Sequence, residues 1–429
     1  MSNLNNKNII LCVGRMYPMT IESIQAYSKK HKIKFRIALL LDIRDQKKTG
    51  HTLDKTYNNV DIVIKCNTRS TAELEKALNP FRHQIYAVSV RGEVNIPLFR
   101  RLIPHIPYIK TPTIPSLEWS TDKILMRRRM MHYNKKITPR YAIATDANKK
   151  TIERIAKKIE FPLIVKPSAM AASKMITICY HKDEFAKVLK KIMRSVNSIN
   201  KKGADVDIKV LVEQFMEGTM YSIDAYVNSR GTVYQCPVVE VKTGKMIGFD
   251  DFFGYQQMTP SHLKKSSVEK AEEVTREAIH ALGLRSTIVH IELMRMEGGW
   301  KVIELSPRMG GFRHLMYKFS YDIDHVMNDI MIHASKKPII PRRIKGYTVA
   351  MKFFAKKEGK LTKLTGIKRI QQLTSFKEIS INKKIGDPCQ YAKNNGSSVF
   401  NLIMFNKEKS KLLADIRRVE QMLVIETKK

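Results

Sequence analysis

Two glutamates, Glu292 and Glu304, occupy what reads as a β-hairpin, and together they could hold a divalent cation. Residues 286–294 (STIVHIELM) and 300–308 (WKVIELSPR) alternate as strands do, and a glycine-containing turn joins them. A three-residue loop with Gly299 in the left-handed conformation would place the two carboxylates directly opposite each other. Like charges in that position repel, and Mg²⁺, which takes carboxylate and phosphate oxygens, would offset the repulsion. On the hairpin alone, a metal–nucleotide site and an exposed polar face fit equally well.

Further polar residues have types that suit nucleotide phosphates. His290, Ser306 and Arg308 share the face of the two glutamates. Lys166 ends an apolar strand and is followed by the small residues 167–174, which could fold over phosphates. Together these positions favour a nucleotide site over a plain polar surface.

Two more residues suit a nucleotide through their positions in the expected elements. Glu213 ends another short strand, before a segment whose backbone groups could meet an adenine edge. Lys123 lies just inside a helix that Ser120 or Thr121 is expected to cap. A cation is disfavoured at that end of the helix macrodipole, and an anion bound there would explain its placement.

Three other polar features have no single interpretation. The aromatic segment with Asp250 and Asp251 fits either a substrate loop or a hydrophobic turn with N-capping aspartates. Asp224 fits either a ligand or a polar residue on a strand face. The arginine run 127–129 is most simply a solvated helix face.

The elements that must position these residues fall into three groups. Residues 8–105 alternate short apolar strands with helical stretches, which predicts a small parallel α/β unit. Gly14 follows the first strand, but the residues directly after it (RMYPM) supply no second or third glycine, so a dinucleotide-binding fingerprint is absent. Four prolines between residues 104 and 115 then mark a domain boundary.

The rest of the chain changes character twice. From residue 116 to about 336 a helix is followed by strand–loop–strand segments and several hairpins. After Pro338, short strands are expected over 347–355, 376–381 and 398–405, and a closing helix over 407–423. This last part reads as a third subdomain or lid.

Composition limits the classes of protein to consider. The chain has 43% hydrophobic and 27% charged residues, as globular proteins do, and no apolar run of the roughly 18–20 residues that a membrane helix needs. We expect no membrane association. Five scattered cysteines without a CxxC pair, and an N-terminus without an apolar signal core, fit the cytoplasm.

The net charge of +37 permits two interpretations. One is nucleic-acid binding, and the other is a lysine-rich solvated surface. The second is favoured because the excess positive charge is spread along the chain and not concentrated in one tail or motif. The sequence leaves open whether the chain forms a homodimer.

Four segments, in this order, resemble the ATP-grasp superfamily. They are FPLIVKPS (161–168), VLVEQFMEGTMYSIDAYV (210–227), IVHIELM (288–294) and KVIELSPRMGGF (301–312). The resemblance implies an α/β and α+β fold. Residues 1–110 would form the parallel α/β domain that precedes the grasp fold in carboxylate–amine ligases, 111–336 the two-lobed ATP-grasp core and 337–429 an α+β closing subdomain.

The resemblance also implies a cofactor, ATP with Mg²⁺ or with Mn²⁺ in its place, and a set of site residues. Lys123 and Lys166 would contact phosphates, and Glu213 would contact the adenine amino group. Arg308 would be the catalytic residue that stabilises the transferring phosphoryl group. The full expected ATP-binding set is Lys123, Lys166, Ser173, Glu213, Gln214, Phe215 and Met216, and the expected metal ligands are Glu292, Glu304 and Ser306.

Two departures from the family pattern concern the phosphate loop and the metal. Alanines at 169, 171 and 172 replace the usual glycines, so the loop is expected to be stiffer. Ser306 stands where the family commonly has an asparagine ligand, which leaves the second metal ion open.

The expected activity is Mg²⁺-dependent ligation of a small-molecule carboxylate to an amine through an acyl phosphate, with release of ADP and phosphate. Three alternatives remain. Attack by a thiol and transfer to another phosphoryl acceptor lie within the superfamily, and a basic nucleic-acid-binding protein lies outside it.

Overall fold

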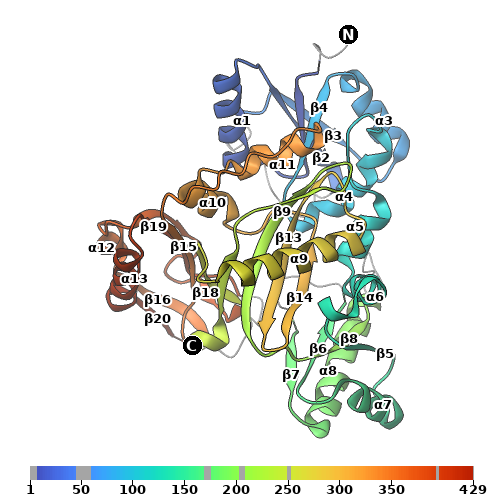
Figure 1. Ribbon diagram of the computed structural model, residues 1–429, viewed down its shortest axis with the longest axis vertical. Helices are drawn as coiled ribbons and strands as arrows, with labels where there is room; N and C mark the ends of the chain where they lie inside the picture. Colours follow the sequence, from blue (N-terminus) through green and yellow to red (C-terminus); the bar gives the residue numbers. More distant parts are fainter. Residues whose placement is uncertain are drawn as a thin grey trace.

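The computed structural model describes residues 7–44, 59–168, 175–201, 208–248, 253–392 and 396–428. In these ranges the strands form four sheets (Figure 1). The N-terminal sheet and the small sheet of residues 141–214 lie at opposite ends, with the largest sheet between them. No helix in these ranges is both long and apolar enough to cross a membrane.

The N-terminal sheet is parallel throughout, with strand order β3-β2-β1-β4. Its central strand β1 (Ile9–Val13) is buried at every residue, as expected where helices cover both faces of a sheet. This confirms the predicted parallel α/β unit. The other elements are β2 (Arg36–Asp42), β3 (Ile62–Cys66), β4 (Ile85–Val90), α1 (Pro18–His31), α3 (Thr71–Leu78) and α4 (Ile96–Leu102).

The small sheet is antiparallel, with strand order β5-β8-β6-β7, and two helices pack on it. Helix α8 (Lys182–Lys201) buries Phe185, Leu189, Ile192 and Val196, a helical spacing that gives one apolar face. That face packs on the sheet and fixes the strands that carry Lys166 and Glu213. The other elements are β5 (Tyr141–Ala144), β6 (Leu163–Pro167), β7 (Thr177–Cys179), β8 (Val210–Gln214) and α7 (Lys149–Ile159).

The largest sheet is antiparallel, with strand order β14-β13-β9-β11-β12-β15-β19-β17 and β10 beside β9. Helix α9 (Lys265–Ala281) crosses one face of β9 (Thr219–Val227), β13 (Thr287–Met296) and β14 (Gly299–Ser306) (Figure 1). Its Ala271 and Ala278 share a core with Trp300 and Val302. The other elements are α5 (Ile114–Thr121), α6 (Lys123–Tyr133), β10 (Val233–Gln235), β11 (Val239–Thr243), β12 (Gly254–Thr259), α10 (Arg313–Tyr321) and α11 (His325–His333).

The C-terminal residues extend the largest sheet, because β15 pairs with β12 and then with β19. The predicted final helix is present as α13 (Lys409–Met422), but the prediction that it closes the chain is wrong. Strand β20 (Val424–Lys428) follows it and pairs with β16. The elements of this part are β15 (Tyr347–Phe353), β16 (Gly359–Thr365), α12 (Ile367–Gln371), β17 (Phe376–Ile381), β18 (Pro388–Cys389) and β19 (Phe400–Asn406).

Candidate active site

Glu292 and Glu304 face each other across β13 and β14, as the sequence predicts, although the turn differs from the expected one. Near the tip Met296 pairs with Gly299, so the loop has two residues and not three. The register then shifts by one residue between Leu293 and Glu292. This β-bulge restores the opposition of the two glutamates that the shorter turn would have removed.

The two carboxylates are held by cations on either side. Glu304 lies 2.8 Å from the Lys123 Nζ, and Glu292 lies 3.6 Å from the His290 Nε2. Burial alone would lower the pKa of Lys123, but Glu304 outweighs burial and the pKa is raised. Burial alone would raise the pKa of Glu292, yet His290 and Arg308 hold it below its ordinary value. Glu292 is therefore ionised at neutral pH.

Lys123 is the first residue of α6, and its predicted cap is wrong. Ser120 and Thr121 end the preceding helix α5, and Asp122 caps α6 by accepting hydrogen bonds from the N–H groups of residues 124 and 125. The Asp122 carboxylate thus satisfies the free N–H groups of this helix end. The Lys123 side chain is left to reach across to the hairpin.

Glu213 lies in a buried ion cluster with Lys166 and Arg127. Its carboxylate is 2.5 Å from the Lys166 Nζ and 2.5 Å from the Arg127 Nε. The expectation that Arg127 belongs to a solvated face is wrong, because its side chain is 1% exposed and also donates to the Ile303 carbonyl. Although burial would raise the pKa of Glu213, Arg127 and Lys166 hold it at about 2. Burial lowers the pKa of Lys166 despite the opposing effect of Glu213.

In the segment after Glu213, the backbone N–H groups differ in whether they already donate a hydrogen bond. The Gln214 and Phe215 N–H groups donate to the Arg140 and Pro162 carbonyls, so neither is free to meet a base. The Met216 N–H donates to none of the described residues. Ser173, also expected to bind ATP, lies outside the described residues, as do Asp250 and Asp251.

A cavity of about 480 Å³ opens at the two glutamates. Ser306 and Arg308 line it on the hairpin side, Glu93 on the N-terminal side and Lys352 on β15. The Arg308 guanidinium donates to the Met309 carbonyl at 3.0 Å and lies 3.6 Å from the Glu93 carboxylate. The N-terminal domain thus helps to place Arg308 beside the carboxylates.

Asp224 is a buried hub beneath this cavity. Its carboxylate accepts hydrogen bonds from the His290 Nδ1 at 2.6 Å and from the Gly310 N–H at 2.8 Å. It also lies 2.9 Å from the His325 Nε2. Burial would raise its pKa, but the two histidines hold the pKa well below its usual range. With its carboxylate fully buried and bonded, Asp224 orients His290, which in turn contacts Glu292.

The donor set at the hairpin fits a magnesium ion that also binds phosphate. Within the described ranges no cluster of three or more His, Cys, Asp or Glu side chains could enclose a metal. Two facing carboxylates and the Ser306 hydroxyl are instead an open set of oxygen donors. Mg²⁺ commonly uses one or two carboxylates with phosphate oxygens and water completing its shell.

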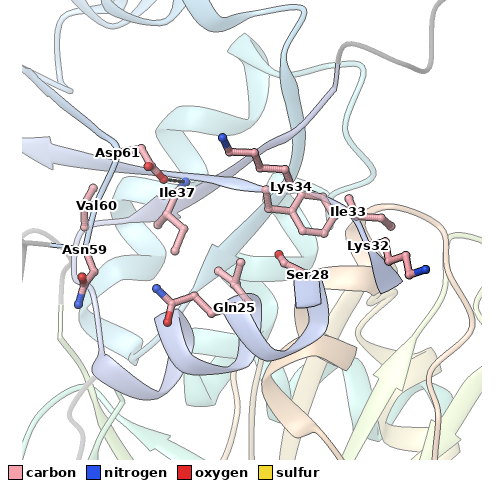
Figure 2. Close-up of a pocket in the computed structure, with 11 residues that line it drawn as sticks. Gln25, Ser28, Lys32, Ile33, Lys34, Ile37, Asn59, Val60 and Asp61 are labelled. Atoms are coloured by element: carbon pink, nitrogen blue, oxygen red, sulfur yellow. Dashed lines mark hydrogen bonds between the residues drawn. The ribbon is translucent and has the colours of Figure 1, made fainter. Parts of the chain in front are cut away.

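A second cavity, of about 560 Å³, lies in the N-terminal domain away from these residues. Figure 2 shows Gln25 of α1 on the side of Asn59 and Val60 and Ser28 nearer Ile33 and Lys34, with the Asp61 carboxylate bonded to the backbone of Ile37. Asp61 accepts that N–H at 2.7 Å and so supports the end of the sheet. The lining of this second cavity has one carboxylate, Asp61, and not the pair of facing carboxylates that lines the hairpin cavity.

Sequence reasoning missed three residues that the structure brings to the site. Arg127 lies one helical turn after Lys123, a spacing that puts both on one face of α6. Asp224 was noted without a role, and its pairing with His290 depends on β9 lying beside β13. Lys352 alternates with apolar residues on its strand, and this pattern indicates only that its side chain points to the opposite face of the sheet from theirs.

Comparisons with known proteins agree with this geometry. The ATP-grasp domain family matches residues 159–315. The L-amino acid ligase of Bacillus licheniformis superimposes with a TM-score of 0.81 over 99% of both chains at 15% identity. The biotin carboxylase domain of the Hydrogenobacter thermophilus 2-oxoglutarate carboxylase, solved with MgADP, has a TM-score of 0.66 over 98% of this chain and 90% of that one, at 16% identity.

Similarity is also found at the sequence level. The phosphoribosylamine–glycine ligase of Listeria monocytogenes is 25% identical over 195 residues, which is 42% of this chain and 44% of that protein. The chain spans about half the length, or less, of the curated relatives it matches. The matching family covers the strands of Lys166, Glu213, Glu292 and Glu304, so residues 159–315 carry an ATP-grasp domain.

Proposed function

We propose that this chain is a Mg²⁺-dependent ligase that joins a carboxylate to an amine and converts ATP to ADP and phosphate. The observation that carries the proposal is the pair of facing carboxylates, Glu292 and Glu304, in one cavity with Arg308. Phosphoryl transfer depends on positioning and charge neutralisation more than on covalent help from the protein. The L-amino acid ligase and the phosphoribosylamine–glycine ligase among the similar proteins support a ligase reaction.

The nucleotide would lie between the small sheet and the hairpin. Lys123 contacts Glu304 and Lys166 contacts Glu213, so each lysine is already oriented before phosphates arrive. The Met216 N–H, which donates to none of the described residues, is the donor that we assign to the adenine edge, with Gln214 and Phe215 shaping the segment. The Glu213 carboxylate has lone pairs left for the adenine amino group, so that contact stays a prediction.

Glu292, Glu304 and Ser306 would hold Mg²⁺, or Mn²⁺ in its place. When bound, the ion would neutralise phosphate oxygens as a Lewis acid. The Lys123–Glu304 contact of 2.8 Å holds the Glu304 carboxylate at the cavity that it lines. Lys123 could then exchange part of this contact for a phosphate oxygen without a large movement.

The reaction proceeds in two displacements. A substrate carboxylate oxygen attacks the γ-phosphorus of ATP, the bond to ADP breaks, and an acyl phosphate forms. A neutral amine then attacks the acyl carbon, phosphate leaves, and the amine loses a proton. Arg308 offsets the charge that develops on the transferring phosphoryl group, and Glu93 positions Arg308.

The cavity walls would protect the acyl phosphate from water. Glu93, the two glutamates of the hairpin and Lys352 of β15 all line this space. An acyl phosphate hydrolyses readily, so excluding water directs it to the amine.

Analysis of the nucleotide product tests this proposal. The chain would be incubated with ATP, Mg²⁺, pooled carboxylates and pooled amines, and the products separated. We expect ADP and phosphate in amounts that depend on both pools. AMP and pyrophosphate would contradict the mechanism.

Arg308→Ala should leave ATP binding intact but lower carboxylate-stimulated ADP release by about 100-fold or more, because an electrostatic contact to the transferring group is lost. Steady-state ADP release and equilibrium nucleotide binding would be measured in parallel. Arg308→Lys should recover part of the rate, since it keeps the charge without the planar fork. Arg230→Ala, at an exposed turn, is the matched control, and normal turnover by Arg308→Ala would refute the assignment.

A further inference from the structure

Lys352 is a cation that the proposed reaction does not yet use. It lies near the end of β15 and lines the cavity of Glu292 and Glu304. Its ammonium group stands 4.1 Å from the ring centre of Phe253 and 5.5 Å from that of Phe312. The side chain therefore lines the cavity close to two aromatic rings.

The charge of Lys352 is not balanced in the way that the other cations of this cavity are. Arg308 lies 3.6 Å from Glu93, and the Arg313 Nε lies 3.8 Å from Asp224. No carboxylate of the described residues lies within 4.0 Å of the Lys352 ammonium group. Burial lowers the pKa of Lys352 to about 8, so the group still carries a proton at neutral pH. A partly buried charge of this kind is stabilised when an anion binds to it.

Lys352 and Arg308 are two cations on different elements of one cavity, so each can bind its own anion. The carboxylate that receives the phosphoryl group must lie at Glu292, Glu304 and Arg308. Lys352 lies instead on β15, beside Phe253, and not on the strands that carry Lys166 and Glu213. The amine attacks the acyl carbon through a face of its carbonyl group, so the amine substrate must lie beside the reacting carboxylate in the cavity that Lys352 also lines.

We propose that Lys352, with Phe253 beside it, binds a carboxylate carried by the amine substrate, so that the acceptor is an amino acid and not a simple amine. This inference rests on the proposed ligase function. The ammonium of Lys352 would also disfavour a second positive charge nearby, and so favour the neutral, nucleophilic form of the incoming amine. Phe253 and Phe312 offer apolar surface for the acceptor's side chain.

The test compares acceptors with and without a carboxylate on the full chain. ADP release would be measured with pooled carboxylate donors and, as acceptors, pooled L-amino acids, the corresponding amino acid amides, or hydroxylamine. Lys352→Met, Lys352→Arg and the matched control Lys356→Met, at an exposed position, would be compared with the parent. Thermal unfolding would show that each variant is folded.

We expect the parent to prefer amino acids to their amides. Lys352→Met should lower kcat/KM for amino acids by about 10- to 100-fold, mainly through KM, as loss of one charged hydrogen bond predicts. It should leave hydroxamate formation from hydroxylamine unchanged, and Lys352→Arg should restore part of the loss. Lys356→Met should behave as the parent.

Three results would overturn the inference in different ways. Unchanged amino acid kinetics in Lys352→Met would remove Lys352 from acceptor binding. A higher KM for the donor in the hydroxylamine reaction would assign the anion to the donor substrate. If the parent itself forms neither hydroxamate nor ADP with any donor, the proposed ligase function fails, independently of Lys352.

Discussion

Glu304→Gln should lower Mg²⁺-dependent ADP release by about 10³-fold, because losing a charged metal ligand removes several kcal/mol of transition-state stabilisation. Glutamine keeps the shape of the side chain but not its charge. Nucleotide binding without metal should change less, since Lys166 and Met216 remain. Turnover at saturating ATP across a Mg²⁺ titration is the measurement.

Glu297→Gln is the matched control, because Glu297 is exposed at the turn of the same hairpin. Glu304→Gln should also be less stable than the parent, since Lys123 loses the carboxylate 2.8 Å away and remains buried. Relief of repulsion between the two glutamates acts in the opposite direction but is the smaller effect. Equal turnover in Glu304→Gln and the parent would remove Glu304 from the metal site.

Glu213→Gln should lower the free energy of unfolding by about 3–5 kcal/mol, because it leaves Arg127 and Lys166 as buried cations without their shared carboxylate. Chemical denaturation at neutral pH is the measurement. Glu217→Gln, four residues later and exposed, should be close to neutral. The double variant Arg127→Met with Glu213→Gln should recover part of the loss, since one unpaired charge is removed with its partner.

The stability difference should also depend on pH. The pKa of Glu213 is lowered in the folded state to about 2, from an ordinary value near 4.5. Its stabilising effect is therefore complete above about pH 4.5 and is lost as the pH falls toward 2. The gap between the parent and Glu213→Gln should be largest at neutral pH and narrow below about pH 4.5. A gap that stays constant down to pH 3 would contradict the ion cluster.

The N-terminal sheet and the hairpin were predictable because their signals are local. Strands such as β1 are continuous apolar runs, as buried parallel strands are. The opposition of Glu292 and Glu304 was also predicted, but from a three-residue loop that does not exist. A two-residue turn followed by a bulge and a three-residue loop without one give the same pairing of the two glutamates, and the sequence does not distinguish them.

The ion cluster was not predictable, because its members come from distant parts of the chain. Arg127 and Glu213 are 86 residues apart, and three consecutive arginines look alike until the helix has a partner. Of the three arginines, only Arg127 lies one helical turn after Lys123, and this spacing alone distinguishes it from Arg128 and Arg129. Asp224 and Lys352 are similar cases, since strand pairing, and not residue type, brings them to the cavity.

Trapping with hydroxylamine tests the central claim, formation of an acyl phosphate in the cavity of Glu292, Glu304 and Arg308, most directly. The chain would be incubated with ATP, Mg²⁺, pooled carboxylates and hydroxylamine, and hydroxamate and ADP quantified together. The account predicts equal amounts of hydroxamate and ADP in the parent and in Arg230→Ala, and a loss of both in Arg308→Ala and Glu304→Gln. ADP release without hydroxamate, or hydroxamate accompanied by AMP, would contradict it.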